Sequence, residues 1–176
     1  MTIDDLKQKD STFQSSLFLS KANSRMKKIF NAITLNELDS VHHFMSENVF
    51  LKFQKEMNDA KNEGLRLIYE EVNIQSDISN IEEIDQSFLI HVFMECKYLK
   101  YYLSLDSGNV VKGNNQNRSS CIYHVVFKKK MGTSLGEVAR CLGCGSPIPI
   151  NENGKCPHCG RIFDLDQFDY IIESIQ

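Results

Sequence analysis

The chain has 176 residues, of which 41% are hydrophobic and 24% are charged, so it is long enough for one medium-sized domain with its own core plus a small module. The formal net charge of -3 predicts no strong electrostatic attraction to nucleic acid or to an anionic membrane. No apolar run approaches the roughly 20 residues of a membrane-spanning helix. The acidic start of the chain does not resemble a secretory signal. We therefore expect a cytoplasmic protein.

Helical patterns dominate the first third of the chain. Residues 1–15 are polar and lack periodicity, so we expect a flexible N-terminus. Thr34 and Glu37 have the spacing of a capping box that would begin a second helix, and Ser46 suits the N-cap of a third helix that ends near Gly64. The first helix is predicted by apolar residues that recur every three or four positions, at Leu19, Ala22, Met26, Ile29 and Ile33.

At Leu65 the apolar period changes from 3.6 to 2, which predicts strands over residues 65–74, 88–105 and 121–130. Apolar positions are even-numbered up to Cys96 and odd-numbered from Leu99 onward. This change predicts a bulge or bend near Lys97 and Tyr98. Residues 106–120 are rich in Asn and Gly and are expected to be a connection. Cys96 and Cys121 are interpreted as core residues.

Helices that precede strands indicate the α+β class, with the helices packed on one face of a bent antiparallel sheet. The main domain is placed at residues 16–131, and residues 132–139 form a predicted linker. The last segment, residues 164–176, carries an apolar stripe that predicts an amphipathic helix. That helix would pack on the protein itself or, alternatively, dock on a partner.

Four cysteines lie in two C-x-x-C pairs, at Cys141, Cys144, Cys156 and Cys159. Each pair is followed by glycine, as in a zinc knuckle, and two knuckles supply the four thiolates of a tetrahedral structural zinc site. We therefore predict a zinc ribbon over residues 140–163 that holds one zinc ion, with a redox-active pair as the weaker alternative. His158 is expected to be exposed and not to bind the metal, because four thiolates already close the site.

Three segments together resemble the Tim44-like domain family, which is named after a subunit of the mitochondrial inner-membrane import translocase and has bacterial members. They are Val41–Phe50, Tyr101–Gly113 and Tyr123–Lys128. The resemblance covers roughly residues 16–130, and the ribbon resembles that of bacterial members. Tyr123 stands where tryptophan is common in the family, and Lys128 where arginine is common. The resemblance implies a cone similar to nuclear transport factor two, with helices against a strongly curved sheet.

The resemblance also implies a non-enzymatic adaptor or binding module that is linked to protein transport and associates with a membrane. A protein partner bound to the inner face of the cell membrane is expected, and the cone would enclose a pocket for a lipid or another apolar ligand. The residues expected to line this pocket are Phe53, Met57, Phe88, Val92 and Phe127. Two basic clusters are candidate membrane contacts: Arg25, Lys27 and Lys28, and Lys128, Lys129 and Lys130.

Two other classes of function remain open at this stage. Cones of this type also form enzymes with a buried general base, for which the candidates are His91, Glu95, Tyr102 and His124. No pair of these has the spacing of a known catalytic set. Nucleic-acid binding through the ribbon is the other alternative, but the ribbon lacks a dense basic face and interleaved aromatic residues, so we expect no strong binding.

Overall fold

The computed structural model describes residues 1–131, 141, 143–147, 155–162 and 169–176. Its strands form one antiparallel sheet in the order β1-β2-β3-β4. Within the described residues, no helix is long and apolar enough to cross a membrane. The elements in chain order are α1 (Ile3–Lys9), α2 (Ser15–Leu35), the 3-10 helix η1 (Leu38–Phe44), α3 (Glu47–Asn62), β1 (Leu65–Ile84), β2 (Ser87–Ser104), β3 (Val110–Lys130) and β4 (Ile171–Ile175).

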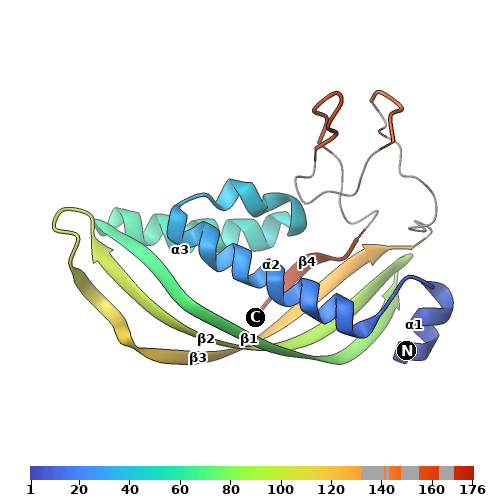
Figure 1. The fold of residues 1–176 in the computed structure, drawn as a ribbon, viewed down its shortest axis with the longest axis horizontal. Coiled ribbons are helices and arrows are strands. Elements are labelled where there is room, and N and C mark those ends of the chain that lie inside the picture. Colours follow the sequence, from blue (N-terminus) through green and yellow to red (C-terminus); the bar gives the residue numbers. More distant parts are fainter. Residues whose placement is uncertain (132–140, 142, 148–154, 163–168) are drawn as a thin grey trace.

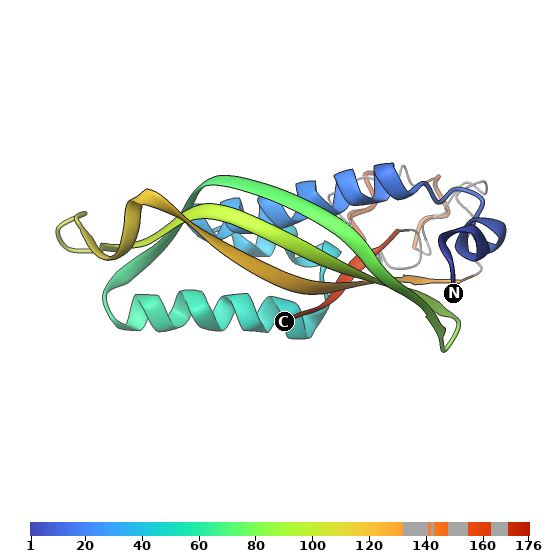
Figure 2. The same ribbon diagram turned by 90° about the horizontal axis from the view of Figure 1, so that it is seen from below.

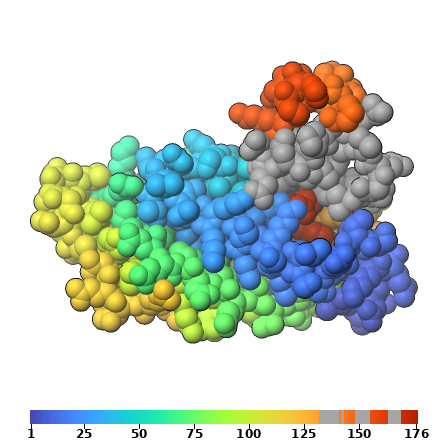
Figure 3. Space-filling view, viewed as in Figure 1, coloured from blue at the N-terminus to red at the C-terminus, as the bar shows by residue number. Residues whose placement is uncertain are grey.

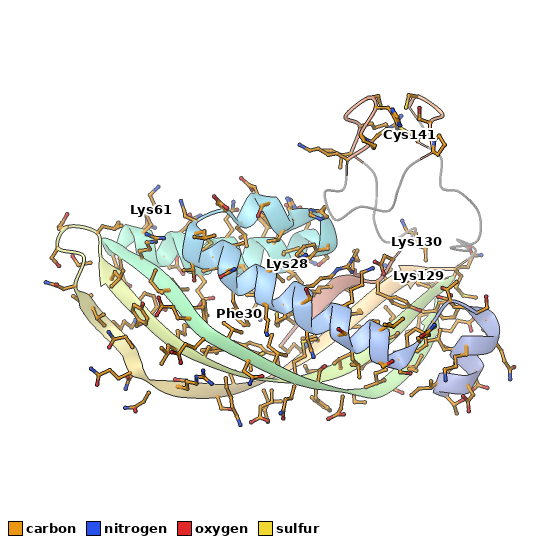
Figure 4. The ribbon with its side chains drawn as sticks, viewed as in Figure 1. Lys28, Phe30, Lys61, Lys129, Lys130 and Cys141 are labelled. Carbon is orange, nitrogen blue, oxygen red and sulfur yellow. The ribbon has the colours of Figure 1, made fainter. Side chains whose placement is uncertain are left out.

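The sheet is long and strongly curved, and α2 and α3 lie on its concave side (Figures 1 and 2). The space-filling view shows α2 packed along β1 (Figure 3). One apolar core fills the space between the helices and the sheet. Phe30 points from α2 toward the sheet, where its ring centroid lies 4.6 Å from that of Tyr69 (Figure 4). The predicted α+β class, with helices on one face of a curved antiparallel sheet, is confirmed.

The N-terminus is ordered, so the prediction of a flexible segment over residues 1–15 is wrong. Thr2 and Asp5 form a reciprocal capping box that begins α1. Leu6 is fully buried in the main core, and Lys9 pairs with Glu83 at the end of β1. The segment is mostly polar, so the sequence gives little sign of the one buried apolar residue, Leu6. The burial of Leu6 and the capping box together hold a short helix in place.

The second α-helix predicted from the sequence does not form, whereas the third is confirmed. Thr34 is not an N-cap but lies inside α2, where its hydroxyl donates to the carbonyl of Tyr69 at 3.0 Å and accepts from the amide of Tyr69 at 2.8 Å. The chain then forms η1 instead of an α-helix. Ser46 does cap α3, accepting a hydrogen bond from the Val49 amide at 3.3 Å.

Irregular pairing does occur near Lys97 and Tyr98, where the sequence predicts a bulge or bend, although the extra residues lie in the neighbouring strands. The pairing of β2 with β3 shifts between Tyr98 and Lys100, and its pairing with β1 shifts between Glu70 and Asn73. The shift against β1 inserts one extra residue in β1 near Glu71, which has a φ of 51°. From Leu99 onward, the odd-numbered apolar residues of β2 face away from the helices. They form a second small cluster, made of Ile68, Leu99 and Tyr101 with Leu103 packed against it.

Two further segments are strands where the sequence indicated otherwise. Residues 110–120 extend β3 as an exposed polar edge, a composition that discourages pairing with other chains. Residues 171–175 form β4 beside β3, not the predicted helix; residues 164–168 of that prediction lie outside the described residues. Ile172 and Ile175 are both buried although three apart, because the register against β3 shifts between Val126 and Phe127. Their spacing of three residues, which suggested a helix, is therefore explained by the irregular pairing of β4.

Candidate metal centre and groove

Two cysteine turns of the same construction form the candidate metal centre. In the first, the Gly145 amide donates to the carbonyl of Cys141 at 2.9 Å; in the second, the Gly160 amide donates to the carbonyl of Cys156 at 2.9 Å. The two glycines have φ values of 72° and 75°, a region that other residues adopt at a cost in energy. Each C-x-x-C-G segment therefore folds as a knuckle, as the sequence predicts.

The four sulfur atoms of Cys141, Cys144, Cys156 and Cys159 lie within 4.8 Å of one another and could hold a metal ion. The sulfurs of Cys141 and Cys159 are 3.5 Å apart, and those of Cys144 and Cys156 are 3.7 Å apart. Sulfurs bound tetrahedrally at about 2.3 Å lie about 3.8 Å from one another. The Gly143 amide also donates to the Cys141 sulfur, at 3.3 Å. The spacing therefore suits one tetrahedral ion.

The pKa values of the thiols are also consistent with a shared metal site. Hydrogen bonds from Ser146 lower the pKa of Cys144 to about 6. The backbone hydrogen bond from Arg161 acts to lower the pKa of Cys159, but the neighbouring thiols, with Cys141 the largest contributor among them, raise it to about 11. The pKa values of these two neighbouring thiols are therefore pushed apart when no cation is present, and a dication held by the four sulfurs would offset the repulsion between thiolates. His158 is exposed and is not in the group.

A groove of about 480 Å³ opens between the end of α2, η1, α3 and the start of β1. Leu35 and Leu105 on its rim are 56% and 55% exposed. Its apolar lining comprises Ile33, Leu35, Leu38, Phe50, Met57, Leu65, Leu67 and Leu105; its polar lining comprises Asn36, Asp39, Gln54, Asn58, Lys61 and Arg66.

Of the five predicted pocket residues, only Met57 lines this groove. The other four, Phe53, Phe88, Val92 and Phe127, are 6% exposed or less and pack inside the main core, so side chains fill the region where the sequence placed a pocket. The groove lies instead where several elements end. Such a place has no periodic signal in the sequence, because each element contributes only one or a few residues there.

Each predicted basic cluster contains one residue that is buried and paired inside the protein. Lys129 is 2% exposed, and its ammonium group lies 2.6 Å from the Asp10 carboxylate and 5.4 Å from the centre of the Tyr170 ring. Lys128 lies 3.6 Å from Glu173. In the other cluster, Arg25 is 3% exposed and donates to Asp169 at 2.9 Å. Lys129 and Arg25 are therefore core ion pairs, and the prediction that they contact a membrane is wrong.

The four candidates for an enzyme do not share a cavity. His91 and His124 are hydrogen-bonded at 3.1 Å on the sheet face that points away from the helices, whereas Tyr102 packs against the main core and lies under Lys112. Glu95 accepts from Ser120 at 3.3 Å. Of the four, only the two histidines are brought into contact. The sequence did not predict that Glu82 lies within hydrogen-bond distance of His91.

Comparison with known proteins places this geometry in a family. One solved structure that matches the chain is the intermembrane-space region of the chloroplast protein ARC6, at 9% identity and a TM-score of 0.41, covering 64% of this chain and 85% of that one. No curated protein matches the chain. The model of the Tim44-like domain matches residues 1–138, which include α1 to α3 and β1 to β3 but neither the knuckles nor β4. The chain therefore belongs to the Tim44-like domain family.

Proposed function

We propose that the protein is a non-enzymatic adaptor in protein transport that holds a segment of a partner protein in the groove between α2, α3 and β1. Its family membership supports the link with transport. The observation that carries the proposal is the groove itself, which is open, lined by both apolar and polar side chains, and rimmed by exposed leucines. Exposed apolar patches on a soluble domain mark sites of interaction.

The charges at the groove indicate the chemistry of the partner. Lys61 projects from the last turn of α3 (Figure 4), and the Arg66 guanidinium donates to the Thr34 carbonyl at 2.5 Å, which fixes it beside the groove. Asp39 is the one acidic residue among the lining residues. We infer that the segment bound here is apolar and carries a carboxylate that pairs with Lys61.

The metal centre has a structural role in this proposal, with zinc as its ion. Four thiolates leave no open coordination position for water or substrate, so the ion supplies folding energy instead of chemistry. Since Lys128 and Lys129 are paired internally, the protein would reach the inner face of the cell membrane through a membrane-bound partner.

The groove is tested by photo-crosslinking in cells. A photo-reactive amino acid at Leu105, on the groove rim, should give a discrete protein adduct, whereas the same probe at Leu17, which is 62% exposed and lies on α2 away from the lining, should not. The variant Lys61→Glu should weaken the Leu105 adduct several-fold by reversing the charge. Equal adducts from both positions, or an adduct that is a lipid by mass, would overturn the proposal of a protein segment.

A further inference from the structure

A pair of histidines lies on the open, convex face of the sheet, away from both the knuckles and the groove. Val92 and Val125 are fully buried under the helices, so the residues that alternate with them point to the opposite face. In the β2–β3 register, His124 lies opposite Phe93 and His91 lies opposite Val126. The two imidazoles are therefore diagonal neighbours on one face of two adjacent strands.

The two side chains are already in contact and held in place. Nδ1 of His91 lies 3.1 Å from Nε2 of His124, and the rings are inclined by only 20°. On its other side, Nε2 of His91 lies 3.3 Å from a carboxylate oxygen of Glu82. The His91 side chain is 19% exposed, and the ring of Phe93 lies 5.2 Å from that of His124. Glu82, His91 and His124 are thus connected in that order by two close contacts.

We propose that His91 Nδ1 and His124 Nε2 bind a divalent transition metal at a second site, separate from the four thiolates. Two imidazole nitrogens bound tetrahedrally at about 2.0–2.1 Å lie about 3.3 Å apart, close to the distance already present. Metal-binding histidines commonly donate their other ring N–H to a carboxylate, which fixes the tautomer. Glu82 occupies that position on His91.

The protonation states are consistent with this assignment. With the Nε2 proton of His91 held by Glu82, Nδ1 of His91 carries the free lone pair. In the metal-free state His124 donates its Nε2 proton to that lone pair. In the metal-bound state the proton of His124 resides on Nδ1 instead, so both facing nitrogens are donors to the metal and no proton is released.

The ligand set also indicates the class of metal. Imidazole suits Zn²⁺, Cu²⁺ and Ni²⁺, and affinities rise from Ni²⁺ to Cu²⁺ and fall again at Zn²⁺. Two protein ligands leave the remaining positions to water or to a ligand from another molecule. The site therefore exchanges its metal readily, in contrast to the closed thiolate centre.

Zinc stoichiometry tests the site. Purified protein dialysed against micromolar Zn²⁺ should hold about two zinc ions per chain by elemental analysis, one at each site. His91→Gln and His124→Gln should each reduce this to about one. His42→Gln is the matched control, because His42 is a single imidazole paired with Glu47 at 2.7 Å, and it should leave the content unchanged. Glu82→Gln should weaken binding at the second site about tenfold or more.

A second, spectroscopic readout does not depend on counting ions. Cu²⁺ added to zinc-loaded protein should give an electron paramagnetic resonance spectrum with nitrogen couplings, and either histidine variant should remove them while retaining native circular dichroism. A wild-type protein that holds only about one zinc, or a second zinc that survives in both histidine variants, would overturn the proposal.

Discussion

Two buried ion pairs connect segments that lie far apart in the sequence. Lys129, at the end of β3, pairs with Asp10 in the loop after α1. Arg25, in α2, pairs with Asp169 just before β4 and donates a second hydrogen bond to the carbonyl of Tyr170. A buried charge that loses its partner is strongly destabilising, so each pair makes the fold depend on both of its members.

The first prediction at this scale concerns Asp10. Burial acts to raise the pKa of Asp10, but hydrogen bonds from Lys129 and Thr12 outweigh it and leave the pKa below the ordinary 3.8. Such a carboxylate stabilises the fold fully above the unfolded-state pKa, and the stabilisation is lost as pH falls through the lowered folded-state pKa. Asp10→Asn should therefore cost about 3 kcal/mol of unfolding free energy at pH 7, and the difference from wild type should shrink below about pH 4.

Urea unfolding at pH 7 and at pH 3 measures this difference. Asp4→Asn is the control, since the Asp4 side chain is 88% exposed, and it should change stability little at either pH. A cost for Asp10→Asn that is the same at both pH values would contradict the role assigned to the ionised carboxylate.

At the scale of the elements, one serine connects α3 with β4. The Ser46 amide donates to the carbonyl of Ile172 at 2.7 Å, and its hydroxyl donates to the carbonyl of Glu173 at 2.8 Å while it accepts from Val49. Lys52, six residues after Ser46, donates to the carbonyl of Ile175 at 2.8 Å. The start of α3 thus serves as a dock for the last strand.

Replacing Ser46 should separate its two roles. Ser46→Ala removes the cap and the hydroxyl bond to Glu173, and we expect a loss of about 1–2 kcal/mol. Ser46→Asp keeps a capping oxygen but cannot donate to the carbonyl, so it should restore α3 without restoring β4. Hydrogen exchange at the amides of Ile172 and Ile175 measures how stably β4 is held. Exchange rates that are unchanged in both variants would refute the docking role.

The same elements show what the sequence could and could not predict. The cap at Ser46 and the two knuckles were predictable because each depends on residues a few positions apart. The pairing of Lys129 with Asp10 was not, because the two residues lie 119 positions apart in the sequence. β4 was missed because the burial of Ile172 and Ile175 depends on a register shift against β3, which only the tertiary pairing determines. The groove collects residues from element ends and has no pattern of its own.

Across the whole molecule, the knuckles lie in a segment inserted between two strands that pair with each other. The chain leaves β3 at Met131 and returns at Asp169 to form β4. Ile172 is fully buried and Ile175 is 6% exposed in the same core as α2 and α3. The contacts that hold the C-terminal strand are therefore contacts of the main domain. A longer free loop after loss of the metal adds little to the closure cost, because that cost grows only with the logarithm of loop length.

The last prediction is that loss of the metal unfolds the knuckles and spares the strand. Cys144→Ser should lose the zinc ion that remains after dialysis against metal-free buffer, because three thiolates bind zinc far more weakly than four. Cys121→Ser is the control, since Cys121 lies in β3 outside the metal group, and it should keep that ion. In Cys144→Ser, hydrogen exchange should accelerate at the amides of Gly145 and Gly160 while that of Ile172 stays slow. If the Ile172 amide instead exchanges as fast as the knuckle amides, the metal centre and the sheet unfold as one unit, and the division into a self-sufficient domain and a metal-dependent insertion is wrong.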